Sequence, residues 1–305
     1  MFSKEFEIEA KKPFRLDFTV WVLRRRSKNI VDRFDENIYS RLFNLNNQPI
    51  LVNVTHPNGK DKPTSLKLKL LSEKNISKQQ IAQIKFLIIK MLGLNVDLSQ
   101  FYNISKEDSV IENLAQQFYG MRPTRYPSIF EALINAVACQ QVSLDSGIAV
   151  LNRLIETYGK NLTFENKTYY AFPAPEDLLN VEDIDFRKIG FSHQKIKTIK
   201  KLVCSILNNE INLELLESAD SSHILQALQK LHGIGRWSAE YVLLRGFSRL
   251  DVFPGDDVGG QNNLMHLYGL NSKPSYIKLN QLISNWHPFE GLAYFHLLLS
   301  KLNLK

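Results

Sequence analysis

The apolar residues of this 305-residue chain change their spacing partway along the sequence, and the change limits the fold to an α+β class. In the first third, residues 50–54 and 66–70 form short runs typical of strands, and residues 14–18 alternate apolar and polar side chains in the same manner. Residues 56–59, His-Pro-Asn-Gly, predict a turn between two of these runs. We therefore expect a small antiparallel sheet with one packed face and one solvated face.

From residue 81 apolar side chains recur at helical intervals, and from about residue 108 the pattern is helical throughout. Ser77 with Gln80, and Ser128 with Glu131, have the form of capping boxes that open helices. We expect an N-terminal α+β domain over residues 1–107 and an all-α region over residues 108–305. In the all-α region the pattern predicts helices that include residues 130–137, 151–158, 177–180, 194–207, 223–231, 237–245, 275–285 and 289–301.

The composition is that of an ordinary globular protein, with 44% apolar and 23% charged residues. There is no long uncharged apolar stretch, so we expect no membrane span and a location in the cytosol. The two cysteines, Cys139 and Cys204, lie far apart and are too few for an iron–sulfur cluster or a zinc site, so we expect no metal site. A net charge of +7 favours an anionic partner. The densest basic cluster, residues 24–26 with Lys28, is either a solvated face or a phosphate contact.

One segment combines a tight reversal with the start of a helix. A helix with Leu225, Leu228 and Leu231 on one face ends at Gly233-Ile234-Gly235, and a second helix begins at once. Glycine reaches positive φ angles without a Cβ clash, so two glycines permit the reversal. The unpaired N–H groups at the start of the second helix would then form a phosphate site. The alternative is a plain corner between two helices with no ligand.

Two adjacent carboxylates, Asp256 and Asp257, follow this hairpin after Pro254-Gly255 and precede a further helical stretch. An aspartate in that position is commonly only a helix N-cap. Beside an anion-binding hairpin, however, a carboxylate is useful if it acts on the sugar of a nucleotide. Gly259-Gly260 are poor helix formers, so we expect the following helix to start late.

The hairpin, followed by Asp251-Val252-Phe253-Pro254 and then Asp257, resembles the helix-hairpin-helix (HhH-GPD) DNA glycosylases, and most of all the DNA-3-methyladenine glycosylase II type. This resemblance implies a helical bundle of two subdomains with the active-site cleft between them, behind an N-terminal antiparallel sheet domain. It covers residues 110–301 and, more weakly, the sheet domain. Further similar segments are residues 130–133, 139–143, 172–176, 189–192, 286–289 and 293–296.

Carried over position by position, the resemblance implies that Asp257 is the catalytic carboxylate. Trp237 and Tyr241 match positions that line the base pocket, although both could be ordinary core aromatics. Gln141 stands where a side chain fills the gap left by a flipped nucleotide. The residues that grip the DNA backbone would be Gly233, Ile234, Gly235, Arg236 and Ser238, with a monovalent cation held by hairpin carbonyls.

The predicted function is that of a monomeric base-excision-repair enzyme that flips alkylated purines, of the 3-methyladenine type, out of damaged double-stranded DNA. It would hydrolyse the N-glycosidic bond with water and leave an abasic site, because Trp237 stands where strand-cutting relatives have a lysine nucleophile. Two alternatives stay open. One is a glycosylase for deaminated or oxidised bases, and the other is a non-catalytic DNA-binding protein in which Asp257 only caps a helix.

Overall fold

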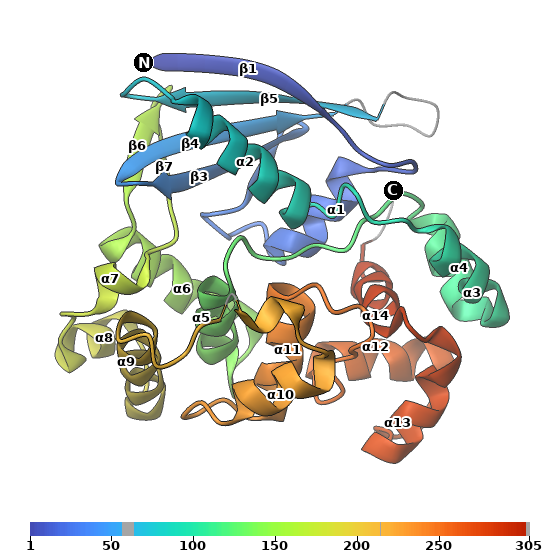
Figure 1. Cartoon of the computed structure of the whole chain (residues 1–305). Coiled ribbons are helices and arrows are strands. Elements are labelled where there is room, and N and C mark those ends of the chain that lie inside the picture. Colours follow the sequence, from blue (N-terminus) through green and yellow to red (C-terminus); the bar gives the residue numbers. More distant parts are fainter. Residues whose placement is uncertain (57–63, 214, 303–305) are drawn as a thin grey trace.

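The computed structural model describes residues 1–56, 64–213 and 215–302. Its N-terminal part is the antiparallel sheet that the sequence predicts, with the strand order β1-β5-β4-β3-β2 (Figure 1). The predicted strand runs at 50–54 and 66–70 lie in β4 and β5, and residues 57–59 of the predicted turn lie outside the described residues. The strands are β1 (Phe2–Glu9), β2 (Arg33–Asp35), β3 (Ile38–Leu45), β4 (Gln48–Thr55) and β5 (Ser65–Ser72).

The strand-like pattern at residues 14–18 was misread, because helix α1 (Leu16–Arg24) begins inside it. Alternation arises here because two different faces of the helix are buried. Leu16, Val20 and Leu23 pack in one hydrophobic core, whereas Phe18 and Val22 pack in another. A helix buried on two sides shows apolar residues two apart without being a strand.

Helix α2 (Lys78–Met91) and a β-hairpin pack on the sheet. Helix α2 opens with the predicted capping box, in which the Ser77 and Gln80 side chains each bind the other's backbone. The hairpin consists of β6 (Asn161–Phe164) and β7 (Lys167–Tyr170), and its Leu162 packs in a small cluster with Leu51 of β4. The prediction that the chain is helical throughout from residue 108 was therefore wrong at this hairpin.

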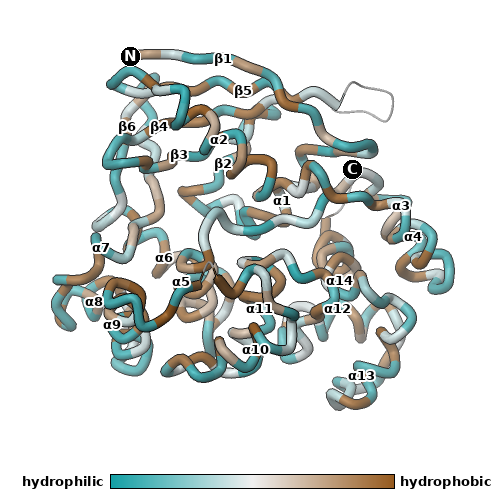
Figure 2. Tube along the Cα trace, in the orientation of Figure 1, coloured by the Kyte–Doolittle hydropathy of each residue, from teal (hydrophilic) through white to brown (hydrophobic). Residues whose placement is uncertain are grey.

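The remaining segments are helical, as predicted. Hydrophilic and hydrophobic residues alternate along outer helices such as α8 and α9 (Figure 2), as expected of helices that bury one face. Among the described residues, no helix is long and apolar enough to cross a membrane. The helices are α3 (Ser99–Ile104), α4 (Ser109–Gln117), α5 (Ile129–Cys139), α6 (Leu144–Tyr158), α7 (Pro175–Leu178), α8 (Asp183–Ile189), α9 (His193–Leu207), α10 (Ser221–Gln229), α11 (Arg236–Gly246), α12 (Val258–Tyr268), α13 (Tyr276–Ile283) and α14 (Glu290–Leu299).

Two hydrophobic cores hold these helices. The first contains the inner face of the sheet and α5 to α11, and the second contains α3, α4 and α12 to α14. Helix α1 contributes to both. The division of the chain at residue 107 stays a prediction; the helices on either side of it, α3 and α4, pack in the same core.

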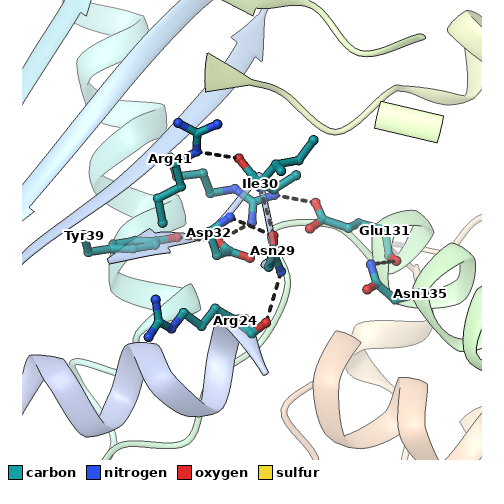
Figure 3. A network of polar contacts seen from close by, with 10 residues as sticks. Arg24, Asn29, Ile30, Asp32, Tyr39, Arg41, Glu131 and Asn135 are labelled. Atoms are coloured by element: carbon teal, nitrogen blue, oxygen red, sulfur yellow. Dashed lines mark hydrogen bonds and ion pairs between the residues drawn. The ribbon is translucent and has the colours of Figure 1, made fainter. Parts of the chain in front are cut away.

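A buried ion-pair network joins the sheet to α5 (Figure 3). The guanidinium of Arg41 on β3 donates to Asp32 Oδ1 at 2.7 Å and to Glu131 Oε2 at 2.6 Å, and the Tyr39 hydroxyl donates to the same Asp32 oxygen at 2.8 Å. Glu131 therefore does not complete the predicted capping box: Ser128 accepts from the Glu131 backbone, but the Glu131 side chain turns to Arg41. A buried guanidinium leaves an unpaired charge unless carboxylates meet it, so the pairing overrides the cap.

Burial raises the pKa of Glu131 to about 7, and Arg41 offsets only part of that effect. Between the ordinary value of 4.5 and 7 the folded protein binds more protons than the unfolded chain, so this group lowers stability as the pH rises. We expect the free energy of unfolding of the wild type, relative to Glu131→Gln, to fall as the pH rises from about 4.5 to about 7.5. Urea denaturation of both proteins across this range measures the difference. Parallel curves would contradict it.

Candidate active site

An open cleft of about 1130 Å³ lies where segments from both hydrophobic cores meet. Its walls come from the end of α1, the end of α5, the start of α9, the hairpin between α10 and α11, the start of α12 and the inner side of α14. A cleft of this size can enclose a base with part of its sugar. The elements that form it are far apart in sequence, and packing alone brings them together.

The predicted reversal between α10 and α11 is present, and its two glycines have different roles. Gly233 has φ +76°, and a Cβ there would lie 2.0 Å from the Thr198 hydroxyl oxygen. Gly235 has φ −84° and is the N-cap of α11; among the described residues nothing lies within 4 Å of the Cβ it lacks. Ile234 between them is buried. The open side of Gly235 faces the cleft, and no described side chain caps the first turn of α11.

The end of α5 reaches the hairpin through Gln140. Its amide nitrogen donates to the Gly233 carbonyl and to the hydroxyl of the buried Ser238, both at 2.9 Å. The next residue, Gln141, is exposed at the rim of the cleft with φ +53°. Its side chain is thus not used to hold the hairpin, because Gln140 does that.

Asp257 stands at the start of α12 with its two carboxylate oxygens in different contacts. Oδ2 accepts from the Gly260 N–H at 2.8 Å, so Asp257 is the N-cap of the helix. Oδ1 accepts from the indole N–H of Trp237 at 3.3 Å. Both Asp257 and Asp256 line the cleft, but Asp257 is half-buried whereas Asp256 is exposed. The capping contact thus fixes the carboxylate without removing it from the cleft.

The glycine pair after Asp257 does not delay the helix, contrary to our expectation: α12 begins at Val258. A Cβ at Gly260 would lie 2.7 Å from the ring of Tyr294, which is buried beneath the start of α12. Close packing of this ring against the backbone therefore explains the glycine. Burial and the neighbouring Asp257 charge raise the pKa of the Tyr294 phenol well above its usual value, so this phenol stays neutral beside the carboxylate.

Trp237 and Tyr241 form a stack on one side of α11, with ring centroids 5.6 Å apart and planes at 30°. Trp237 is half-buried, whereas Tyr241 is 2% exposed and its hydroxyl lies 2.9 Å from that of Tyr126. Both line the cleft. The ring open to a ligand is therefore mainly that of Trp237, with Tyr241 behind it.

Arg25 enters the cleft from the end of α1. Its guanidinium carbon lies 5.2 Å from the Tyr241 ring centroid, and both terminal nitrogens lie 3.7 Å from the Cys139 sulfur. Arg26 also lines the cleft and pairs with Asp145 at 3.3 Å, whereas Arg24 donates to the Phe34 carbonyl outside it. The basic cluster thus divides into two residues that line the cleft, Arg25 and Arg26, and two that do not, Arg24 and the exposed Lys28.

The structure brings most of the predicted site residues to one cleft and adds three that the sequence analysis missed. The added residues are Arg25, Gln140 and Tyr294. Tyr294 lies within a segment that carried the family resemblance, and Gln140 precedes a predicted residue, but the sequence gives no signal that separates Arg25 from its neighbours. The predicted residues in the cleft are Gln141, Gly233, Gly235, Arg236, Trp237, Ser238, Tyr241 and Asp257.

Comparisons with known proteins agree with this geometry. A family model described as "HhH-GPD superfamily base excision DNA repair protein" matches residues 134–288. The chain is 26% identical over 284 residues to a DNA-3-methyladenine glycosylase of Bacillus subtilis, which covers 93% of each chain.

Two solved structures share the fold. A 3-methyladenine DNA-glycosylase from Archaeoglobus fulgidus superposes with a TM-score of 0.82 at 22% identity, over 98% of this chain and all of that one. An 8-oxoguanine glycosylase/lyase of Clostridium acetobutylicum, in complex with double-stranded DNA, superposes with a TM-score of 0.75 at 20% identity, over 98% of this chain and 96% of that one.

The two hairpin glycines give a matched pair of variants. Gly233→Ala should lower the free energy of unfolding by about 2–4 kcal/mol, because alanine is strained at positive φ and its Cβ would displace the buried Thr198. Gly235→Ala should cost less than about 1 kcal/mol, since its backbone is extended and its Cβ meets open space. Chemical denaturation measures both. Equal costs would contradict the assigned conformations.

Proposed function

The chain belongs to the HhH-GPD superfamily of base excision DNA repair proteins, and from this we infer that it is a DNA glycosylase that releases alkylated purines and uses water as its nucleophile. The observation that carries the proposal is the Asp257 carboxylate. It lies in the cleft at the foot of the hairpin, held in a fixed orientation by Trp237 and Gly260.

The proposed reaction requires a fixed negative charge at this position. As the bond between the purine nitrogen and C1′ breaks, its electron pair leaves with the base and the deoxyribose becomes an oxocarbenium-like cation. The Asp257 carboxylate stabilises that cation electrostatically, and an attacking water forms the new bond to C1′ and passes its proton to bulk water in the open cleft. The two donors on Asp257 keep the carboxylate oriented before the charge develops, so little reorganisation is needed.

The hairpin and Gln141 fit the binding of an opened duplex. The uncapped first turn of α11 offers N–H groups to a phosphate, and Gly235 lets the backbone approach closely. Gln141 lines the cleft with an exposed side chain, which can occupy the space of an extruded nucleotide. The family resemblance implies that the hairpin also binds a monovalent cation. The backbone carbonyls of the hairpin would be its ligands. The Gly233 carbonyl, however, already accepts from Gln140.

The substrate class is proposed from Trp237 and from the relatives. The B. subtilis relative, which aligns over almost the whole chain, is named for 3-methyladenine. Alkylated purines in DNA carry positive charge, and the face of an indole attracts cations. Arg25 covers Tyr241, which leaves Trp237 as the aromatic face available to the base.

We expect Asp257→Asn to lower base release by at least ~100-fold while duplex binding persists, because asparagine can still cap α12 but carries no charge. The assay incubates the protein with duplex DNA treated with a methylating agent and measures free 3-methyladenine and 7-methylguanine by chromatography. Asp256→Asn is the matched control: it removes the neighbouring charge at the cleft from an exposed side chain and leaves the oriented Asp257 in place, so it should lower the rate far less.

The same assay separates the alternatives. Release from duplexes with hypoxanthine, uracil or 8-oxoguanine, but not from methylated DNA, would replace the alkylpurine assignment with one for deaminated or oxidised bases. Binding without release from any of these duplexes would leave only a non-catalytic DNA-binding role.

Sodium borohydride should trap no covalent complex between the protein and lesion-containing DNA. Trp237 has no amine that could form a Schiff base, and this supports a monofunctional enzyme. Lys195 is an alternative amine nucleophile, because it lines the cleft and burial lowers the pKa of its ammonium group. Its Nζ donates to the Ala138 carbonyl at 2.9 Å, which keeps it engaged at the end of α5. A trapped complex that disappears in Lys195→Ala would contradict monofunctionality.

A further inference from the structure

Glu240 on α11 is a buried carboxylate that the proposed reaction does not use. It is 3% exposed, and both of its oxygens are occupied. Oε1 accepts from the Arg236 guanidinium at 2.9 Å and from the Tyr276 hydroxyl at 2.7 Å. Oε2 accepts from the backbone N–H of Gly255 at 3.1 Å. Three segments of the chain therefore meet at one side chain.

The three residues that bind Glu240 belong to three different parts of the chain. Arg236 is the first residue of α11, at the hairpin, and its guanidinium lies 3.4 Å from the Tyr276 ring centroid. Tyr276 begins α13. Gly255 belongs to the loop that ends in Asp257, two residues before the carboxylate. Glu240 thus links the hairpin to the loop that carries the catalytic group.

The loop that carries Asp257 is held at two places, and one of them is the contact between Glu240 and the Gly255 N–H. Phe253 anchors the loop's start by packing on Tyr294, with ring centroids 5.3 Å apart. The Asp257 N–H donates to the Pro254 carbonyl at 2.9 Å, which closes a tight turn around Gly255. A Cβ at Gly255 would lie 2.5 Å from the Tyr276 ring, so the turn is pressed against α13. The Gly255 N–H is the backbone donor that ties this turn to α11.

We propose that Glu240 is a positioning residue, which fixes Asp257 in the cleft by binding the Gly255 N–H while Arg236 and Tyr276 hold its carboxylate in place. The proposal rests on the glycosylase function inferred above. A carboxylate is costly to bury, so its presence here calls for compensating contacts, and its three hydrogen bonds lead to the hairpin, to α13 and to the catalytic loop. An aliphatic side chain would fill the same space but leave the Gly255 N–H without its acceptor.

The Trp237 indole N–H reports the position of Asp257 directly, and independently of catalysis. The chain has three tryptophans, so a ¹⁵N–¹H spectrum contains three indole signals. The Trp286 indole donates to Asp108, and its ring packs on Phe253 at the start of the loop, with ring centroids 6.2 Å apart. We expect Glu240→Ala to move the Trp237 signal, identified by its loss in Trp237→Phe, further than it moves the Trp286 signal.

Excision kinetics test the consequence. Glu240→Ala should lower the single-turnover rate of base release ~10- to 100-fold, as expected for a misplaced catalytic group, and should leave the affinity for a duplex with a tetrahydrofuran abasic analogue nearly unchanged. Glu240→Gln should restore much of the rate, because its amide oxygen can still accept from Gly255. Tyr276→Phe removes one donor from Glu240 but leaves the Gly255 contact, so it should lower the rate less than Glu240→Ala does.

Glu217→Ala is the matched control for a lost ion pair. Its carboxylate pairs with Lys90 and Arg125 away from the cleft, so its removal tests stability without touching the loop. An unmoved Trp237 signal in Glu240→Ala would overturn the proposal. The proposal would also fail if Glu217→Ala, at equal stability, lost as much rate as Glu240→Ala. It would fail as well if Glu240→Gln were as slow as Glu240→Ala. If the wild type releases no base, the proposed function fails, and the indole signal still decides whether Glu240 positions Asp257.

Discussion

Helix α11 is buried along its whole length from Ser238 to Gly246, and the rest of the site is built on it. Its first turn follows the hairpin and carries Trp237, and its second turn supplies Glu240 and Tyr241. A helix surrounded by packing on all sides has little freedom to rotate or slide, because a shift would open voids against every neighbour. The uncapped N-terminus of α11 and the aromatic wall of the cleft are thereby fixed to one rigid element.

Polar groups inside this packing are costly to bury, and several are matched by partners from other segments of the chain. Glu240 meets the Gly255 N–H and Tyr276, and Arg245 donates to the Val22 carbonyl at 2.9 Å. The Arg41 network does the same between the sheet and α5. Such pairs contribute little net stability compared with apolar packing, but a misaligned partner leaves a buried charge unsatisfied. We interpret them as constraints on how the parts are aligned, which is what a cleft formed by several segments needs.

The N-terminal part of the chain also contributes to the site. Helix α1 packs in both hydrophobic cores and ends at the cleft, where Arg25 covers Tyr241. The sheet domain is therefore more than a support, since its helix α1 places the Arg25 guanidinium at the wall of the cleft.

The sequence by itself determined the features that depend on local chemistry. Two glycines around Ile234 specify a tight reversal, a carboxylate follows at a fixed interval, and apolar spacing locates most helices and the sheet strands. Only the tertiary structure decided the features that depend on the partner of a side chain. Residues 14–18 alternate because two cores bury two faces of α1, Glu131 leaves its cap for Arg41, and Gly260 is required by the Tyr294 ring. Periodicity records that a residue is buried but not what buries it. For that reason the roles of Arg25, Gln140 and Glu240 became visible only when distant segments were brought into contact.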